Sequence, residues 1–402
     1  MTARDEYALH PTQPSGHLAP FGIPARLVLS ILESAGILYA SLSPVIVTGL
    51  AQSGALDRAQ AGYVFSCNML GTALGGLCII FFVHRLNWRR ASAGLLVVLI
   101  VLDLISATVS APMQLYVLRF AHGLAGGILI GVAMSVIARM VNPERTVALF
   151  IMLQLITGGA FTLLLAPLLA SPGTYIVWLS LAAFSLLSLL LLPLLGPYPV
   201  ETRQDGSVAT EHTAPFACIL FAMIALFIYQ CGEMAAFAYV IELGFHYEFN
   251  AGFTGTAVAA SLWIGGPAAL FVTWWSTRSG RLVPFLISGA LMVCSIALLL
   301  LPIPLSYLLA NIGFGIFFSI SFPYLMGIAS EMDNSGRMGT AAGFAGNLGL
   351  AAGPTIAGFL VGENQFERVL MFAIAAIAVS MMLATGPARM LDRRNRTGRV
   401  VW

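Results

Sequence analysis

An arginine lies inside an apolar stretch, at about 114–138, that is long enough to cross a bilayer. Placing an arginine at membrane depth costs roughly 2.5–3.5 kcal/mol, so Arg119 needs a partner or a polar cavity. Asp103, in the preceding apolar stretch, is a candidate partner, because it and Arg119 each lie eight residues from a turn expected near Ala111. At about 1.5 Å per residue, both lie about 12 Å below the same surface. The two residues form either a structural ion pair or a charge relay that contacts substrate.

Two carboxylates also fall inside apolar stretches, Glu33 in the first and Glu233 in the seventh. A carboxyl group at membrane depth can take up and release a proton as its access to water changes, which is what a proton-coupled carrier requires. Tyr229 and Gln230 lie one turn before Glu233 on the same helical face, and we expect them to orient it. Glu233 is the first candidate for the coupling proton and Glu33 the second, although Glu33 could simply reach the membrane surface.

Further polar side chains at membrane depth are uncharged or lie near the ends of their stretches. His122 follows Arg119 by one turn, and beside a cation we expect a neutral, hydrogen-bonded histidine, which is the third candidate for coupling. Asn311 and Asn347 lie in the tenth and eleventh stretches and are candidate substrate contacts. Glu242 and Trp178 lie near stretch ends, and we expect both at the membrane interface.

Composition places the whole chain in a membrane. Of its 402 residues, 59% are hydrophobic and only 9% are charged, whereas soluble domains contain about 25% charged residues. Apolar runs of about 20 residues, each able to cross ~30 Å of hydrocarbon, recur at roughly 26–50, 60–83, 91–110, 114–138, 147–170, 174–195, 216–241, 252–275, 283–301, 304–329, 338–361 and 366–387. The sequence therefore predicts an all-α polytopic membrane protein with twelve transmembrane helices.

The types of residue present exclude several functions. All nineteen basic residues are arginine, and both a P-loop and a Schiff base need a lysine, so no ATPase of that type and no cofactor are expected. The five cysteines lie in apolar stretches without the spacing of metal ligands, and we expect buried free thiols and no metal. A single histidine inside the stretches makes an enzyme unexpected. The expected partners are a small-molecule substrate, protons and lipid, without nucleic acid.

Arginine also predicts the orientation and the division of the chain. If the N-terminus is cytoplasmic, sixteen arginines fall in inner loops and tails, and only Arg58 and Arg368 fall outside. Both termini are therefore expected in the cytoplasm. The expected segments are a disordered cytoplasmic tail at 1–25, a six-helix bundle at 26–195, a central cytoplasmic loop at 196–215, a second six-helix bundle at 216–387 and a basic cytoplasmic tail at 388–402.

The two halves of the sequence are related by a constant offset of 192 residues. This offset aligns Arg89 with Arg281, Gly123 with Gly315, Met140 with Met332, Asn142 with Asn334 and Arg145 with Arg337. Two parallel six-helix repeats are typical of one class of transporter. The same offset places Arg119 on Asn311, so the scaffold repeats while the buried charge does not.

Three short sequence motifs are present: one after the second apolar stretch, one after the eighth, and one near the start of the fourth. Residues 84–90 (HRLNWRR) and 277–281 (TRSGR) resemble two copies of one loop motif, with His84 and Ser276 where an aspartate is usual. Residues 119–123 (RFAHG) match the pattern R-x-x-q-G. With twelve spans and a central loop, the chain resembles the major facilitator superfamily. The resemblance implies a conformational role for Arg85, Arg89, Arg90, Arg278 and Arg281, and a central cavity lined by Glu33, Arg119, His122, Tyr229, Gln230, Glu233, Asn311 and Asn347.

The resemblance also implies a function. We expect a monomeric secondary transporter of the bacterial inner membrane that moves a small organic solute by alternating access, coupled to protons. Export is slightly preferred, although the antiporter signature G-x-x-x-G-P-x-x-G-G is missing from the fifth stretch and a similar string at 349–358 lies in the eleventh. Proton-coupled uptake of a small organic acid, with Arg119 binding the carboxylate, is the alternative. A non-transporting receptor or scaffold on the same fold is a third possibility.

Overall fold

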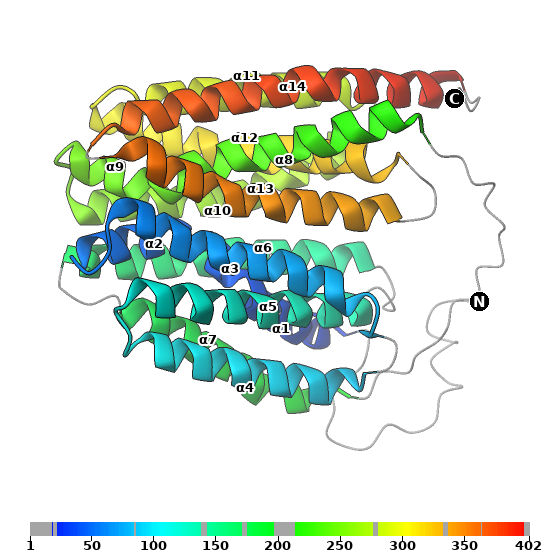
Figure 1. The fold of residues 1–402 in the computed structure, drawn as a ribbon. Coiled ribbons are helices and arrows are strands. Elements are labelled where there is room, and N and C mark those ends of the chain that lie inside the picture. Colours follow the sequence, from blue (N-terminus) through cyan, green and yellow to red (C-terminus); the bar gives the residue numbers. More distant parts are fainter. Residues whose placement is uncertain are drawn as a thin grey trace, which may run out of the picture.

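In a computed structural model, the chain is described at residue 18 and over residues 22–83, 86–137, 143–170, 175–196, 214–275, 280–332, 337–362 and 364–397. The first half contains α1 (Ile23–Ser41), α2 (Ser43–Gln52), α3 (Arg58–Ile79), α4 (Trp88–Ser106), α5 (Pro112–Ile137), α6 (Pro143–Leu165), η3 (Ala166–Ala170), α7 (Tyr175–Leu191) and η4 (Leu192–Leu194). The second half contains α8 (Phe216–Ala238), α9 (Val240–His246), α10 (Ala251–Trp275), α11 (Leu282–Leu298), α12 (Pro304–Ser330), α13 (Arg337–Val361) and α14 (Phe366–Thr397). These helices run side by side along one axis (Figure 1).

Two of the long segments are broken helices. Only Leu42 separates α1 from α2, and Pro44 in the first turn of α2 has no N–H to continue the α1 ladder. Only Tyr239 separates α8 from α9. Counting each broken helix once gives twelve segments among the described residues, six on each side of the central link, as the sequence predicts.

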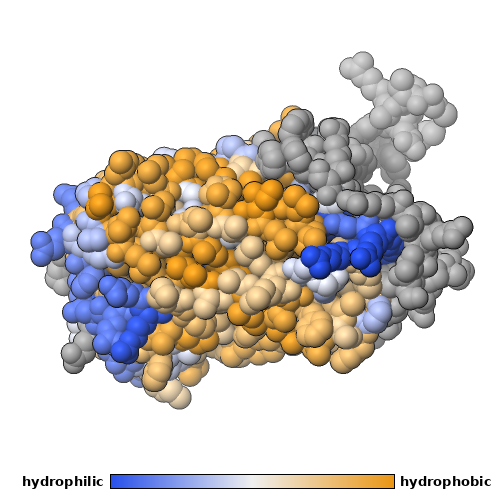
Figure 2. Space-filling model, turned by 90° about the horizontal axis from the view of Figure 1, so that it is seen from above, coloured by the Kyte–Doolittle hydropathy of each residue, from blue (hydrophilic) through white to orange (hydrophobic). Residues whose placement is uncertain are grey.

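The surface of the bundle suits a hydrocarbon environment. Within the described ranges, nine helices are long and apolar enough to cross a membrane, judged by length and composition alone. Leu282–Leu298 is a shorter apolar helix. Large apolar side chains such as Leu190, Phe359 and Met382 are about two-thirds exposed or more. Figure 2 shows hydrophobic residues over the middle of one face and hydrophilic residues towards its ends. On this face the apolar surface forms a band between hydrophilic ends, as expected for helices surrounded by lipid.

Glycine allows the two halves to use the same close helix packing. A Cβ on Gly123 of α5 would overlap the carbonyl oxygen of Asn68 on α3, and a Cβ on Gly315 of α12 would overlap that of Ser261 on α10. Such contacts between small residues are the usual basis of helix association in membranes. The offset of 192 residues that aligns Gly123 with Gly315 therefore corresponds to equivalent backbone contacts in the two bundles.

The last helix continues past the predicted end of its span at residue 387. α14 extends to Thr397 with Pro387 inside it, so the expected boundary at 387/388 falls within a helix. Its apolar face also continues, since Ala388 and Leu391 are buried. Asp392 then accepts hydrogen bonds from the backbone N–H groups of Arg281 and Leu282, at 2.8 and 3.1 Å, and so caps the start of α11.

The cysteines are free thiols, as expected, but they are not all buried. Cys231 is buried, whereas Cys78 and Cys294 are exposed on the outer surface of their helices. Most of the predicted N-terminal tail, most of the central loop and the last five residues lie outside the described residues. The end of the predicted tail at 23–25 instead forms the start of α1.

The close approach of α3 and α5 predicts a specific sensitivity. Gly123→Ala should lower the midpoint of thermal unfolding in detergent, because its Cβ forces α3 and α5 apart, a change that typically costs about 1–3 kcal/mol. Gly94→Ala in α4 is the matched control, because no atom lies within 4 Å of the added carbon. Equal midpoints for the two variants would contradict the packing described here.

Candidate functional site

Arg119 is completely buried and all its described contacts lie within the first half of the chain. One terminal nitrogen donates to Asp103 Oδ1 at 2.8 Å, and the other donates to the carbonyl oxygen of Leu102 at 3.0 Å and to the hydroxyl of Ser106. The guanidinium also lies over the ring of Trp178, 4.5 Å from its centroid. The predicted partner of Arg119 is therefore in contact with it, and the guanidinium is occupied by protein groups.

Asn68 fixes the protonation state of the neighbouring histidine. Its amide nitrogen lies 3.0 Å from the carbonyl oxygen of Arg119, which can only accept, and 2.9 Å from Nδ1 of His122. The amide NH2 donates to both atoms, so Nδ1 is the accepting nitrogen and the ring proton is on Nε2. Nε2 lies 3.4 Å from Asp103 Oδ1. The histidine is neutral in this arrangement, as the sequence predicts, and the cluster of Asp103, Arg119, His122 and Asn68 has no net charge.

The charge cluster has a neutral counterpart in the second half. The offset of 192 residues places Asp103 on Ser295 and Arg119 on Asn311. Ser295 donates to its own helix at Leu291 O, and Asn311 donates to Tyr307 O at 2.9 Å. The second bundle therefore has uncharged residues at the same two positions. Asn311 is buried, and its NH2 group donates a hydrogen bond within its own helix, α12.

The two buried carboxylates are not part of this cluster. Glu33 on α1 and Glu233 on α8 are 1% and 3% exposed. Both oxygens of Glu33 and one oxygen of Glu233 have no hydrogen-bond partner in the described part of the chain. Burial of Glu33 contradicts the alternative in which its carboxylate reaches the membrane surface.

Glu233 lies between two aromatic contacts that join α8 to α12. One turn before it, Tyr229 stacks on Phe318 with centroids 6.5 Å apart, and one turn after it, Phe237 stacks on Phe314 at 5.5 Å. Because residues four apart share a helical face, Glu233 points to the same side as both rings. Gln230 faces a different helix, α13, where a Cβ on Gly349 would come 2.8 Å from its Cβ. No hydrogen bond joins Glu233 to Tyr229 or Gln230 among the described residues, so their predicted role in orienting Glu233 stays a prediction.

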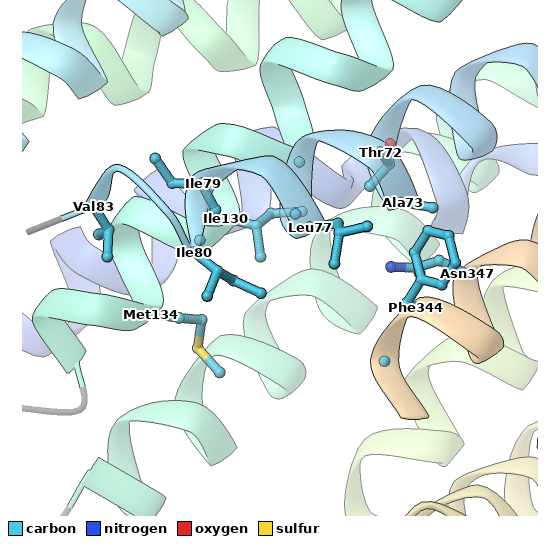
Figure 3. A pocket seen from close by; sticks show the side chains of 14 residues that line it. Thr72, Ala73, Leu77, Ile79, Ile80, Val83, Ile130, Met134, Phe344 and Asn347 are labelled. Atoms are coloured by element: carbon cyan, nitrogen blue, oxygen red, sulfur yellow. The ribbon is translucent and has the colours of Figure 1, made fainter. Parts of the chain in front are cut away.

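A cavity of about 370 Å³ lies between the two halves (Figure 3). The later turns of α3 and α5 line one side, and Gly343, Phe344 and Asn347 at the start of α13 line the other. Of the predicted substrate contacts, only Asn347 lines this cavity; Arg119, Tyr229, Gln230 and Asn311 are buried outside it.

The halves are joined at the other ends of the same helices. Arg58, at the start of α3, forms an ion pair with Glu242 on α9 and lies over the ring of Phe366 at the start of α14. The hydroxyl of Tyr239 donates to Arg58 O at 2.7 Å and lies 3.5 Å from Pro354 O on α13. These contacts lie at the end of the bundle that holds α2 and α9, opposite the end at which α14 stops (Figure 1). The described conformation is thus closed at one end of α3 and α13 and hollow at the other.

The predicted loop arginines are only partly described. Arg85 and Arg278 lie outside the described residues, while Arg89 and Arg90 begin α4, whose N–H at Arg90 is capped by Asn87 at 3.3 Å. Arg281 forms an ion pair with Glu331 at the end of α12. Arg281, at the end of the second loop motif, therefore contacts carboxylates of two neighbouring helices. Its side chain pairs with Glu331, and its backbone N–H donates to Asp392.

Sequence analysis missed or misplaced several of these groups. Glu242 and Trp178, expected at the membrane interface, are buried, because one pairs with Arg58 and the other covers Arg119. Asn68 lies in the second apolar stretch, and its polarity at membrane depth was the available signal for a role beside His122. No sequence pattern indicated that Arg58 and Glu242, 184 positions apart, would meet.

Comparison with known proteins agrees with this architecture. The family model described as Major Facilitator Superfamily matches residues 29–354. A search of curated protein sequences finds no match. The nucleoside transporter NupG is similar in structure, with a TM-score of 0.67, 16% identity, and coverage of 92% of this chain and 98% of that one. A D-xylose–proton symporter gives a TM-score of 0.69 at 14% identity, with coverage of 89% of this chain and 96% of that one. A bacterial homologue of the human lysosomal transporter Spinster, in an inward-facing and occupied conformation, gives a TM-score of 0.68 at 12% identity, with coverage of 94% of this chain and 98% of that one.

The buried ion pair predicts a double-mutant result. Asp103→Asn leaves the Arg119 cation without its counter-charge, which should lower the stability of the folded protein in detergent by about 3–5 kcal/mol. Adding Arg119→Gln should restore part of the loss, because it removes the uncompensated charge. Two single losses that simply add in the double variant would contradict an energetic coupling between the two residues.

Proposed function

Because the chain belongs to the major facilitator superfamily, we propose that it is a proton-coupled secondary transporter that moves a small organic solute by alternating access. The observation that carries this proposal is the asymmetry between the two ends of α3 and α13. One end is closed by contacts between the halves, and the other leaves a cavity of about 370 Å³ between them. A rocking motion of the halves would break the first set of contacts and close the cavity, which is the motion expected of parallel six-helix repeats.

The arginines and the cavity support a proposed orientation and direction of transport. Sixteen arginines on one side favour cytoplasmic termini in a bacterial inner membrane, so the cavity opens towards the cytoplasm. A cavity open to the cytoplasm in the described conformation suits a carrier that collects its solute there, and export remains the preferred direction. The alternative of acid uptake through Arg119 loses support, because the guanidinium is occupied by Asp103, Ser106 and Leu102.

Glu233 is the proposed carrier of the coupling proton. A buried carboxyl group without partners is stable as the neutral acid, because an isolated carboxylate in such surroundings would be costly. The aromatic contacts on either side of Glu233 hold α8 against α12 within the second half, so Glu233 moves with this half when the halves rock and its access to water changes with that motion. Glu33, which is similarly buried and unpartnered among the described residues, is the second candidate. His122 is the third, since protonation of its Nδ1 would require the bond from Asn68 to break. We further propose that the protein acts as a monomer without a cofactor.

Glu233→Gln should separate transport from coupling. Glutamine keeps the shape and hydrogen-bonding capacity of the side chain but cannot release a proton. In proteoliposomes, the variant should retain counterflow of labelled solute, and a pH gradient should no longer raise accumulation above the level reached without one. Glu33→Gln is tested in parallel, and Glu367→Gln, at an exposed position near the start of α14, is the matched control. If both buried variants still concentrate solute on a pH gradient as well as the parent, neither residue is required for coupling.

The Arg58–Glu242 pair should stabilise the conformation that is closed at the α2/α9 end. Glu242→Gln removes the negative charge from an ion pair that joins the two halves, so it should increase the population with this end open. Spin labels at Ala55 and Gln365, both exposed near this end, measure the opening as a longer distance by pulsed electron resonance in a cysteine-free background.

A second ion pair provides the control for this measurement. Glu331→Gln breaks the pair with Arg281, which lies wholly within the second half. It should leave the distance between the Ala55 and Gln365 labels unchanged. If Glu242→Gln and Glu331→Gln give the same distance distribution as the parent, the Arg58–Glu242 pair does not hold this end closed.

A further inference from the structure

The described residues that line the cavity between the halves carry no charge. Its lining comes from α3, α5 and α13 and consists of aliphatic side chains, glycines, one methionine, one phenylalanine, one threonine and one asparagine. A charged solute would leave its hydration shell here without a compensating partner, which is unfavourable by several kcal/mol or more. The buried charges nearby are neutralised within their own cluster, as the contacts of Arg119 show. This cavity therefore suits an uncharged solute.

One side chain in the wall has unused hydrogen-bonding capacity. The hydroxyl of Thr72 donates to Asn68 O at 3.0 Å, within its own helix. Asn347 lines the cavity from the first turns of α13, and its amide has no protein partner in the described part of the chain (Figure 3). A carboxamide presents a donor and an acceptor side by side, so it can pair with a solute edge that offers an acceptor beside a donor.

An aromatic ring accompanies this amide. Phe344 precedes Asn347 by three residues and lines the same wall, so the two side chains lie together on one face of α13, as Figure 3 shows. Aromatic side chains hold flat ring systems by stacking, at about 1–3 kcal/mol for each nucleic-acid base. The opposite wall is aliphatic, with Leu77, Ile80 and Ile130 among its residues. A volume of about 370 Å³ is within the range of small-molecule sites.

We propose that the transported solute is an uncharged planar heterocycle with a neighbouring donor and acceptor, such as a nucleobase or lactam, and that Asn347 and Phe344 select it. The amide of Asn347 pairs with the edge of the ring, and Phe344 contacts its face. This inference rests on the proposed transport function, because the cavity is taken as the solute site.

Three related probes test the class of solute. Uracil carries a donor–acceptor edge, 1,3-dimethyluracil keeps the ring but loses both donors, and orotate adds a carboxylate to the same ring. Equilibrium binding of labelled uracil to the detergent-solubilised full chain should be detectable and saturable. Dimethyluracil should bind roughly 5- to 150-fold more weakly than uracil, the range expected for loss of one bidentate amide pair. Orotate should bind more weakly than uracil because the wall offers no counter-charge.

Variants of the wall assign the contacts. Asn347→Ala should weaken uracil by the same roughly 5- to 150-fold and remove the preference over dimethyluracil. Phe344→Leu should weaken both probes together, since it removes the ring face and leaves the edge contact intact. Gln52→Ala is the control, because it removes an exposed amide at the end of α2, far from the cavity. Thermal unfolding midpoints show whether each variant is folded before binding is compared.

The outcomes separate this inference from the proposed function. Absence of uracil binding, equal binding of orotate, or unchanged discrimination in Asn347→Ala would overturn the solute class. If vesicles nonetheless accumulate another solute on a pH gradient, the transport function stands and the class is wrong. If the probes bind as expected but no solute crosses the membrane of proteoliposomes, the transport function is wrong and the binding site stands.

Discussion

The cost of a cation at membrane depth determines how the first bundle is built. Arg119 must have an anion, hydrogen-bond acceptors and surroundings from which water is excluded. Residues of α4 and α7 supply these to the side chain on α5. Asp103 supplies the charge, Leu102 O and Ser106 Oγ accept further hydrogen bonds, and Trp178 covers the guanidinium. Asn68 then connects α3 to the same cluster through Arg119 O and His122. The contacts of one buried residue and its neighbours thus join four helices of the first half.

The second bundle reaches the same backbone arrangement without that charge. Gly315 approaches Ser261 as Gly123 approaches Asn68, yet Ser295 and Asn311 occupy the positions of Asp103 and Arg119. Close packing through small residues is therefore sufficient for the fold, and the ion pair adds specificity to one half. The proposed functional residues lie where the halves differ. Glu233, with one oxygen unpartnered among the described residues, and its flanking aromatic contacts belong to the second half, and the histidine belongs to the first.

Most of the fold could be predicted from the sequence, because apolar stretches of span length and the arginine distribution are local signals. The partnership of Asp103 and Arg119 was also accessible, because both lie at equal distances from one turn. The contact between Arg58 and Glu242 was not, because it depends on how two halves meet, and no periodicity encodes that. The same limit explains why Asn347 lines the cavity while Asn311 turns back onto Tyr307: both are asparagines at membrane depth, and only their helix rotation distinguishes them. The extension of α14 past Pro387 was missed because a proline usually ends a helix, whereas here burial of Ala388 and Leu391 sustains it.

The hydrogen bonds from the start of α11 to Asp392 attach the extension of α14 to the second half. About ten residues beyond the expected span correspond to ~15 Å of helix. Because Asp392 is hydrogen-bonded to the start of α11, this part of α14 is held against the second half. If the second half tilts as proposed, the end of this extension moves through a larger arc than its start. A probe attached near the C-terminal end of α14 would therefore report the orientation of the second half with high sensitivity.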